Sequence, residues 1–200
     1  VDNRGGGNTI IGSEALVKSP PDGYTLLQSA QPHVITPLLL PTPFDGIKDF
    51  APVATLIKSE FLLVVHPSVP ARNLQEFIAL GKSRPGQLNY ASAGLGSAGH
   101  LGLELFGMMT GVKMQHVPYK GTGQAVSDLI GGQVQVLLAT PISALPHVKS
   151  GKLRGIAYSG ETRWSALPQV LTFTEGGLPN YDVKNWYGVF APVGTPRTII

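Results

Sequence analysis

The chain has 200 residues, of which 42% are hydrophobic and 14% charged, so it can bury a core and is not disordered by composition. Its 15 Lys and Arg residues and 12 Asp and Glu residues give a formal net charge of +3. Because these charges are scattered, the sequence indicates neither a nucleic-acid partner nor a basic membrane helix. The absence of cysteine excludes disulfides, a thiolate nucleophile and a cysteine-based metal site.

Short apolar runs alternate with helix-like segments along the chain, which is typical of an α/β fold with mainly parallel strands. The predicted strands, in chain order, are residues 24–30, 51–57, 61–67, 88–93, 114–121 (ending in a loop), 133–139, 152–159 and 186–192. Helices are predicted over residues 73–83, 97–110 and 122–130, and between Pro141 and Gly151. The chain starts at Val1 without a targeting segment, and we expect it to be a fragment of a longer protein.

Three of these helices carry start signals. Asn73 followed by Glu76 is the pattern of a capping box for helix 73–83. Ser97 is predicted to cap helix 97–110, whose buried face we expect to be Leu101, Leu105 and Met108. Thr122 is predicted to cap helix 122–130.

Small or hydroxyl-bearing residues follow the carboxyl ends of successive predicted strands. In open α/β sheets this edge is where ligands bind. Small side chains let backbone amides approach a ligand closely, and the helix N-termini that follow add partial positive charge. The pattern therefore predicts an anion site that needs no Lys or Arg. The strand-end residues are Ser29-Ala30, Ser92-Ala93-Gly94, Gly121-Thr122, Ala139-Thr140 and Ser159-Gly160.

The glycine loop at 94–99 allows two other interpretations. Gly94, Gly96 and Gly99 have the spacing G-x-G-x-x-G of a dinucleotide site, which also requires an acidic residue about 20 positions further on. The next predicted strand ends in Tyr119 and Lys120 instead. An NADP-type oxidoreductase therefore remains an alternative, and so does a turn that uses small residues only for packing.

Catalytic groups are hard to find in this pattern. Ser97 lies near glycines but outside a G-x-S-x-G motif, and the five histidines have no metal-ligand spacing. His66 and His147 are predicted to be structural. His100, in the first turn of helix 97–110, either touches a bound ligand or is a buried neutral imidazole. No acidic residue ends a strand at the proposed site, so we predict a binding protein without cofactor or metal, and not an enzyme.

Long stretches of the chain resemble the Bug-type extracytoplasmic solute receptors, the substrate-binding proteins of tripartite tricarboxylate transporters. The resemblance begins with DNRGGGNTIIGSEALVKSPPDGYTLL and covers essentially all 200 residues in order. It continues through DFAPVATL, VVHPSVPARNLQEFIAL, PGQLNYASAGLGSAGHL, HVPYKGTGQAVSDLIGGQVQV, SALPHVKSGKLRGIA and WYGVFAPVGTP.

The resemblance implies a periplasmic binding protein fold of type II, with two α/β lobes joined by two crossing strands. Residues 51–58 and 186–192 would be the crossing strands, and residues 59–185 a complete second lobe. Residues 1–58 and 186–200 would form only part of the first lobe together with the crossing strands. Such a truncation would expose apolar surface, so a dimer is a further expectation.

The resemblance also implies a periplasmic receptor that binds a small carboxylate and delivers it to the membrane components of the transporter, or that acts as a signalling sensor. Where many members read FDN, this chain reads Leu138-Ala139-Thr140, so an ammonium group would lack an acceptor and we expect a non-amino carboxylate. The predicted ligand contacts are Ser29, Ala30, Gln31, Ser92, Gly94, Leu95, Gly96, Ser97, His100, Gly121, Thr122 and Thr140.

Overall fold

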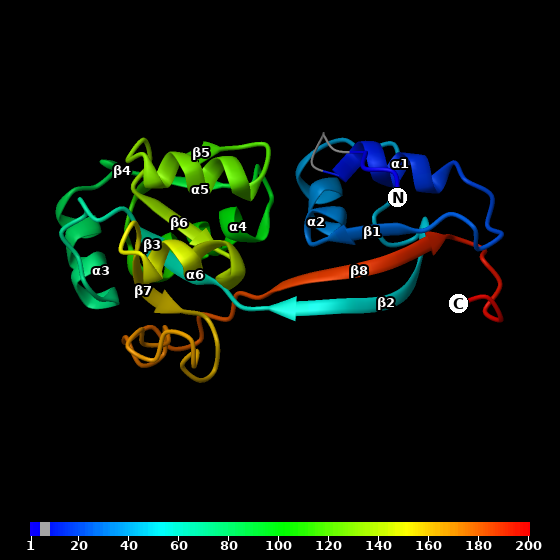
Figure 1. The fold of residues 1–200 in the computed structure, drawn as a ribbon. Helices are drawn as coiled ribbons and strands as arrows, with labels where there is room; N and C mark the ends of the chain where they lie inside the picture. The colour runs from blue at the N-terminus through cyan, green and yellow to red at the C-terminus, as the bar shows by residue number, and fades with distance from the viewer. Residues whose placement is uncertain (5–8) are drawn as a thin grey trace. The chain divides into compact units, whose positions relative to one another are not determined.

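The computed structural model describes residues 1–4 and 9–200, which fall into two compact units (Figure 1). Unit 1 comprises Val1–Lys58 and Asn185–Ile200, and unit 2 comprises Ser59–Lys184. The chain therefore enters unit 2 after Lys58 and leaves it after Lys184. Residues 5–8, which belong to the RGGGN stretch of the resemblance, lie outside the described residues.

Unit 2 is built on a five-stranded sheet with the order β5-β4-β6-β3-β7. Strand β4 is parallel to both β5 and β6, whereas β3 is antiparallel to both β6 and β7. Four of the five strands therefore run in one direction, and β3 runs against them. The strands are β3 (Leu62–Val65), β4 (Leu88–Ser92), β5 (Met114–Pro118), β6 (Val136–Ala139) and β7 (Arg154–Tyr158).

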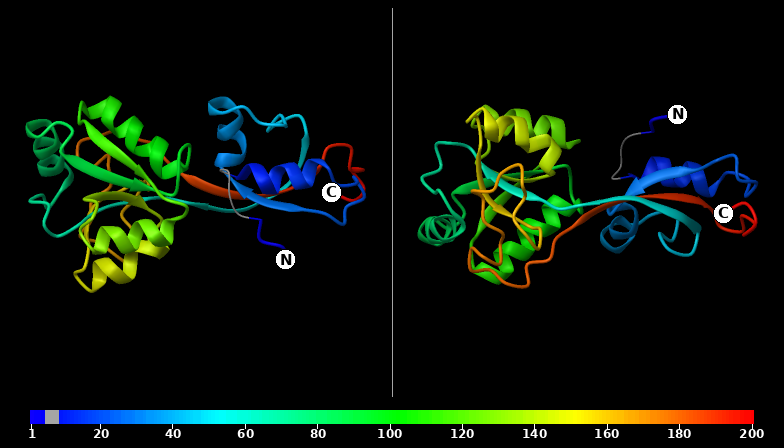
Figure 2. Two further views of the ribbon diagram at one scale, coloured as in Figure 1. Left: turned by 90° about the horizontal axis from the view of Figure 1, so that it is seen from above. Right: turned by 60° about the horizontal axis from the view of Figure 1, so that its bottom comes forward.

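Helices cover both faces of this sheet, as Figure 2 shows. Helices α3 (Leu74–Ser83) and α4 (Ala98–Thr110) lie on one face, and α5 (Thr122–Ile130) and α6 (Pro141–Lys149) lie on the other. Strand β3, which lies between β6 and β7, alternates between the two cores: Leu63 and Val65 pack under α3 and α4, and Leu62 and Val64 pack under α5 and α6. Both faces of the strand are buried, which explains its uninterrupted apolar sequence.

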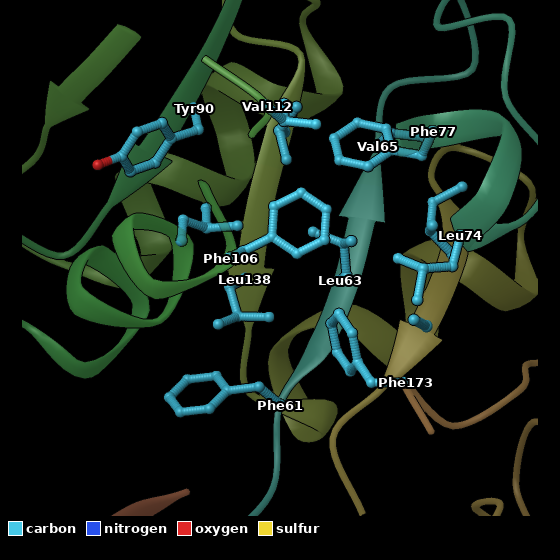
Figure 3. Close-up of a cluster of buried hydrophobic side chains, with 14 of the residues drawn as sticks. Phe61, Leu63, Val65, Leu74, Phe77, Tyr90, Phe106, Val112, Leu138 and Phe173 are labelled. Carbon is cyan, nitrogen blue, oxygen red and sulfur yellow. The ribbon is translucent and has the colours of Figure 1, made fainter. Parts of the chain in front are cut away.

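Aromatic side chains fill the core beneath α3 and α4 (Figure 3). Phe106 of α4 is fully buried, with its ring centroid 5.8 Å from Phe77 of α3 and 6.2 Å from Tyr181. Leu138 of β6 belongs to the same cluster. This packing fixes α4, and with it the glycine loop that precedes the helix, against the sheet.

The predicted helix starts are correct at two positions and wrong at a third. The Asn73 side chain accepts from the Glu76 N–H at 2.9 Å, and Glu76 accepts from the Arg72 N–H at 2.8 Å, which confirms the cap of α3. Ser97 is confirmed as the N-cap of α4, because its Oγ accepts from the backbone of His100. Thr122 is instead the first residue of α5, and Gly121 occupies the N-cap position without a side-chain bond.

The predicted buried face of α4 is also wrong. Met108 is 84% exposed and Leu101 and Leu105 are only half-buried, whereas Gly102 and Phe106 are buried. The reason is close packing of α4 on β6: a Cβ added to Gly102 would lie 2.5 Å from Leu138 Cδ2. Glycine therefore occupies this contact with β6, and the large apolar residues of α4 that enter the core are Leu103 and Phe106.

Unit 1 contains a three-stranded sheet with the order β1-β8-β2. Its strands are β1 (Leu27–Ala30), β2 (Phe50–Ser59) and β8 (Asn185–Pro192), and its helices are α1 (Ile10–Val17) and α2 (Pro32–Leu39). Neither helix was among the predicted elements. Strand β1 starts at Leu27 and not at the predicted residue 24, and it pairs with β8 antiparallel, so the prediction of mainly parallel strands does not hold here.

The core of unit 1 is a small aromatic cluster. Leu16, Phe44 and Phe50 are buried, with Leu27 and Phe190 packed against them. The fully buried His33 ring lies 4.2 Å from Phe50 and 4.5 Å from Phe190, between centroids. Burial lowers the pKa of His33, so this imidazole is neutral and behaves as part of the apolar core.

Candidate functional site

The carboxyl ends of β4, β5 and β6 lie at the same edge of the unit 2 sheet, because these neighbouring strands are parallel. Each strand is followed by a helix that starts at this edge: α4 after β4, α5 after β5 and α6 after β6. Their N-caps are Ser97, Gly121 and Thr140. The structure therefore gathers the predicted contacts of unit 2 at one edge, where three helix N-termini contribute partial positive charge.

The loop after β4 is held by bonds among its own residues. Ser92 Oγ is buried, accepts from the Gly94 N–H at 3.1 Å and donates to the Gly94 carbonyl at 3.0 Å. The Ser97 N–H donates to the same carbonyl at 3.2 Å. Gly94 and Gly96 have φ of 127° and 75°, values that side chains with a Cβ rarely adopt. This compact loop presents the exposed side chain of Leu95 at its tip.

His100 lies behind the loop and is bonded to it. Its Nδ1 accepts from the Gly96 N–H at 3.1 Å, and its own backbone N–H donates to Ser97 Oγ at 3.4 Å. Because a backbone N–H can only donate, His100 Nδ1 carries no proton in this geometry. His100 is therefore a half-buried imidazole that is neutral at Nδ1 and hydrogen-bonded to the loop. The Gly96 amide, a predicted ligand donor, has a partner inside the protein.

Two further aromatic residues support His100 from the sheet. The His116 ring of β5 lies 4.1 Å from the His100 ring and 4.9 Å from the Tyr90 ring of β4, all close to parallel. His116 Nε2 lies 2.6 Å from Ser92 Oγ, and the Tyr90 hydroxyl donates to Glu104 of α4. We call Tyr90, His100 and His116 the aromatic stack.

Burial dominates the electrostatics of the aromatic stack. Burial lowers the pKa of His100, against an opposite effect of the Glu104 carboxylate. Burial, followed by the charge of His100, lowers the pKa of His116 to about 4. Burial and the bond to Glu104 raise the pKa of Tyr90. Both histidines are therefore neutral at physiological pH.

Sequence reasoning missed His116, Tyr90 and Glu104. The available signal is the parallel register, in which Tyr90 lies directly opposite His116, two residues before the ends of β4 and β5. Because each ring lies two residues before a glycine-containing loop, the pair is placed to support both loops. That register becomes visible only once the strand pairing is known.

The loops after β5 and β6 offer small groups and open space. A Cβ added to Gly121 would meet no atom within 4 Å, and Lys120 before it is exposed. Thr140 Oγ1 lies 3.0 Å from Ser143 Oγ within the first turn of α6. The remaining predicted strand-end residue, Ser159, accepts from the Phe61 N–H at 2.7 Å and donates to the Val183 carbonyl at 2.9 Å, so its hydroxyl has a structural role.

Unit 1 carries the other three predicted contacts at the end of β1. Ser29 is buried in the strand, Ala30 ends it, and Gln31 is the N-cap of α2. The Ser29 hydroxyl has no hydrogen-bond partner among the described residues. An unpaired buried hydroxyl is unfavourable unless something binds it, and Ser29 shares this property with Thr9 of the same unit.

An open groove in unit 1 does not coincide with these residues. It lies against β2 and β8, and none of the predicted contacts lines it. Its lining residues are Pro52, Val53, Ala54, Thr55, Trp186, Gly188, Val189 and Phe190. Among residues 1–4 and 9–200, no group of three or more His, Asp and Glu side chains is arranged to hold a metal ion.

The sequence profile of the TctC family, described as the tripartite tricarboxylate transporter family receptor, matches residues 1–200. The chain belongs to this family. Protein BugT of Bordetella pertussis is 38% identical over 203 residues, which cover 100% of this chain and 62% of BugT. Rpa4515 of R. palustris, solved with adipate, has a TM-score of 0.92 at 35% identity, covering 99% of this chain and 67% of that one. MatC of Rhodopseudomonas palustris, with bound malate, has a TM-score of 0.88 at 33% identity, covering 97% and 67%.

These similarities confirm the resemblance to Bug-type receptors and the α/β periplasmic binding protein fold. The TctC family is one of receptors. This chain spans about 60% of the length of the curated relatives that it matches. Within the described part of this TctC chain, no helix has the length and apolar character needed to span a membrane.

Proposed function

We propose that this TctC protein is a periplasmic receptor that binds a small carboxylate and delivers it to the membrane components of a tripartite tricarboxylate transporter. One observation carries the proposal: three neighbouring parallel strands of unit 2 end at one edge in small-residue loops, each followed by a helix N-terminus. Backbone N–H groups and helix dipoles at such an edge balance a negative charge. The unpaired hydroxyl of Ser29 adds a donor in unit 1.

We infer that the ligand is a carboxylate without an amino group. At the end of β6, Ala139 is buried and apolar, and the Thr140 hydroxyl is engaged with Ser143. An ammonium group there would find no carboxylate and would remain unpaired, which is costly. The adipate of Rpa4515 and the malate of MatC, both dicarboxylates without an amino group, support this class.

We propose that most of the predicted contacts bind the ligand and that Gly96 and His100 hold the loop instead. In unit 2 we expect Ser92, Gly94, Leu95, Ser97, Gly121, Thr122 and Thr140 to surround the ligand, with Gly96 and His100 holding the loop. In unit 1 we expect Ser29, Ala30 and Gln31 to contact it. A dimer through unit 1 stays a prediction, supported by its exposed apolar side chains, which include Leu38 at 79% and Ile47 at 76%.

A thermal-shift panel of the full-length protein tests the proposal. The panel holds adipate, malate, aspartate and NADPH, with the dimethyl ester of adipate as a matched control for charge. A ligand at about 100 times its Kd stabilises the folded state by about 2.7 kcal/mol, which raises Tm by several degrees. We expect adipate or malate to do this and the ester and aspartate to fail. A shift with NADPH and with no carboxylate would refute the receptor and revive the oxidoreductase alternative.

A further inference from the structure

We propose that His100 and His116 are positioning residues of the loop at residues 92–97, and that the loop keeps its ligand-binding shape only while His100 is neutral. The inference rests on the proposed function, because it concerns how the same site is held.

Two backbone N–H groups of the loop are hydrogen-bonded within the protein. The Gly96 N–H is bonded to His100 Nδ1 at 3.1 Å, and the Gly94 N–H is bonded to Ser92 Oγ at 3.1 Å. Ser92 Oγ in turn lies 2.6 Å from His116 Nε2. Each histidine therefore fixes one glycine of the loop, His100 directly and His116 through Ser92. Only the loop groups that take no part in these bonds are free to bind a ligand.

His100 works as a variant of a capping box. In the usual form, the N-cap side chain bonds the N–H of the third helical residue, whose own Glu or Gln side chain reaches back. Here Ser97 Oγ accepts from the His100 N–H, and the His100 imidazole reaches back to the N–H of Gly96, one residue before the cap. An imidazole in this place can lose its acceptor by protonation, which a Gln side chain cannot.

Every charged or titratable group around His100 bears on this step. His116 of β5 and Tyr90 of β4 stack on the ring, and Glu104 lies one turn along α4 and binds the Tyr90 hydroxyl. The partial positive charge at the N-terminus of α4 disfavours protonation of His100, and so does a charged His116. The Glu104 carboxylate favours protonation of His100. A proton on Nδ1 would face the Gly96 N–H with a second donor, and the bond between them would be lost.

Nuclear magnetic resonance of the full-length protein tests the geometry without a ligand. We expect the ring nitrogens of His100 to show an unprotonated Nδ1 at pH 7.5, and the Gly96 amide signal to shift with the same midpoint as His100 on acidification. A protonated Nδ1 at pH 7.5, or a Gly96 amide that ignores the His100 titration, would overturn the inference. This result does not depend on whether the protein binds a carboxylate.

Binding measurements with adipate and malate test the consequence. His100→Asn keeps an acceptor atom at the Nδ1 position but does not titrate, whereas His100→Leu removes the acceptor. We expect His100→Leu to bind at least tenfold more weakly at pH 7.5, and His100→Asn to bind within threefold of wild type. As the pH falls from 7.5 through the His100 midpoint that the resonance titration measures, we expect wild-type affinity to fall further than that of His100→Asn.

Protonation of the ligand itself is common to both proteins and cancels in that comparison. His147→Asn, which changes a histidine of α6 outside the aromatic stack, is the matched control and should behave as wild type. Equal affinity of His100→Leu and wild type, or equal pH dependence of His100→Asn and wild type, would contradict the positioning role. If adipate and malate bind to none of the proteins while the resonance titration succeeds, the ligand assignment fails and the loop geometry stands.

Discussion

Replacing Ser29 with Ala should change stability and ligand binding in opposite directions. Ser29 is only 6% exposed, and its Oγ has no hydrogen-bond partner among the described residues. A buried polar group without a hydrogen bond costs about 1–3 kcal/mol, so its removal should stabilise the ligand-free protein by about 1 kcal/mol. For a protein of this size, that raises Tm by roughly 2–4 °C.

The same substitution removes a donor to the carboxylate. A hydrogen bond to a charged group contributes about 1.5–3 kcal/mol, so the affinity for adipate or malate should fall roughly ten- to hundredfold. Calorimetry measures the binding, and a thermal melt without ligand measures the stability. Ser13→Ala is the matched control, because Ser13 is also buried but its Oγ lies 3.3 Å from His33 Nδ1. We expect Ser13→Ala to lower Tm. A Ser29→Ala protein that is less stable, or that binds carboxylates as wild type does, would refute this reasoning.

Three more predictions address the fold and the site edge. Asn73→Ala removes the cap of α3 and should cost about 1 kcal/mol, seen as a lower urea midpoint, while Gln75→Ala on the exposed face of the same helix should change little. Gly121→Ala adds a methyl group where nothing lies within 4 Å, so Tm should fall by only a few degrees while carboxylate affinity falls about fivefold or more; unchanged affinity would place the ligand elsewhere. Because the pKa of His116 in the folded state, about 4, lies below its ordinary value of 6.5, stability should be complete above pH 6.5 and decline as the pH falls toward 4. The full pKa shift corresponds to about 3 kcal/mol of folding stability, and solvent screening of this half-exposed ring reduces that to roughly 1–2 kcal/mol. Urea melts of wild type and His116→Phe at pH 7 and 4.5 measure the loss of stability.

Local signals in the sequence predicted the helices of unit 2 well and those of unit 1 poorly. The caps of α3 and α4 depend on side chains within three residues of one another, so the pattern alone contains them. Helix α2 contains Pro37 in its interior, and α1 contains Gly12, so both helices conflict with local preference. They are stabilised by the aromatic core of unit 1, which brings together Phe44, Phe50 and Phe190 from distant parts of the chain.

The prediction of the buried face of α4 was wrong for a related reason. Large apolar residues usually mark the buried side of a helix, but α4 approaches β6 so closely that glycine occupies the contact. The sheet register decides this, and the register depends on residues of β4 and β6 that are 46 positions apart, such as the pair Tyr90 and Val136. The register between β4 and β5, which places Tyr90 opposite His116, likewise creates the aromatic stack, and no local pattern contains it.

The site illustrates what strand-end patterns can and cannot predict. Because parallel strands end at one edge, a sequence with small residues after successive strands predicts where ligand donors gather. It does not separate donors that hold the loop from donors that are left for the ligand. The structure makes that separation by hydrogen-bond partners: the Gly96 N–H has His100, and the Ser29 hydroxyl has none among the described residues. Gly96 was predicted to contact the ligand directly; because its N–H is bonded to His100 Nδ1, we expect it to support the loop. A buried donor without a partner destabilises the folded protein until a ligand binds it. Ligand specificity should therefore depend more on Ser29 than on Gly96.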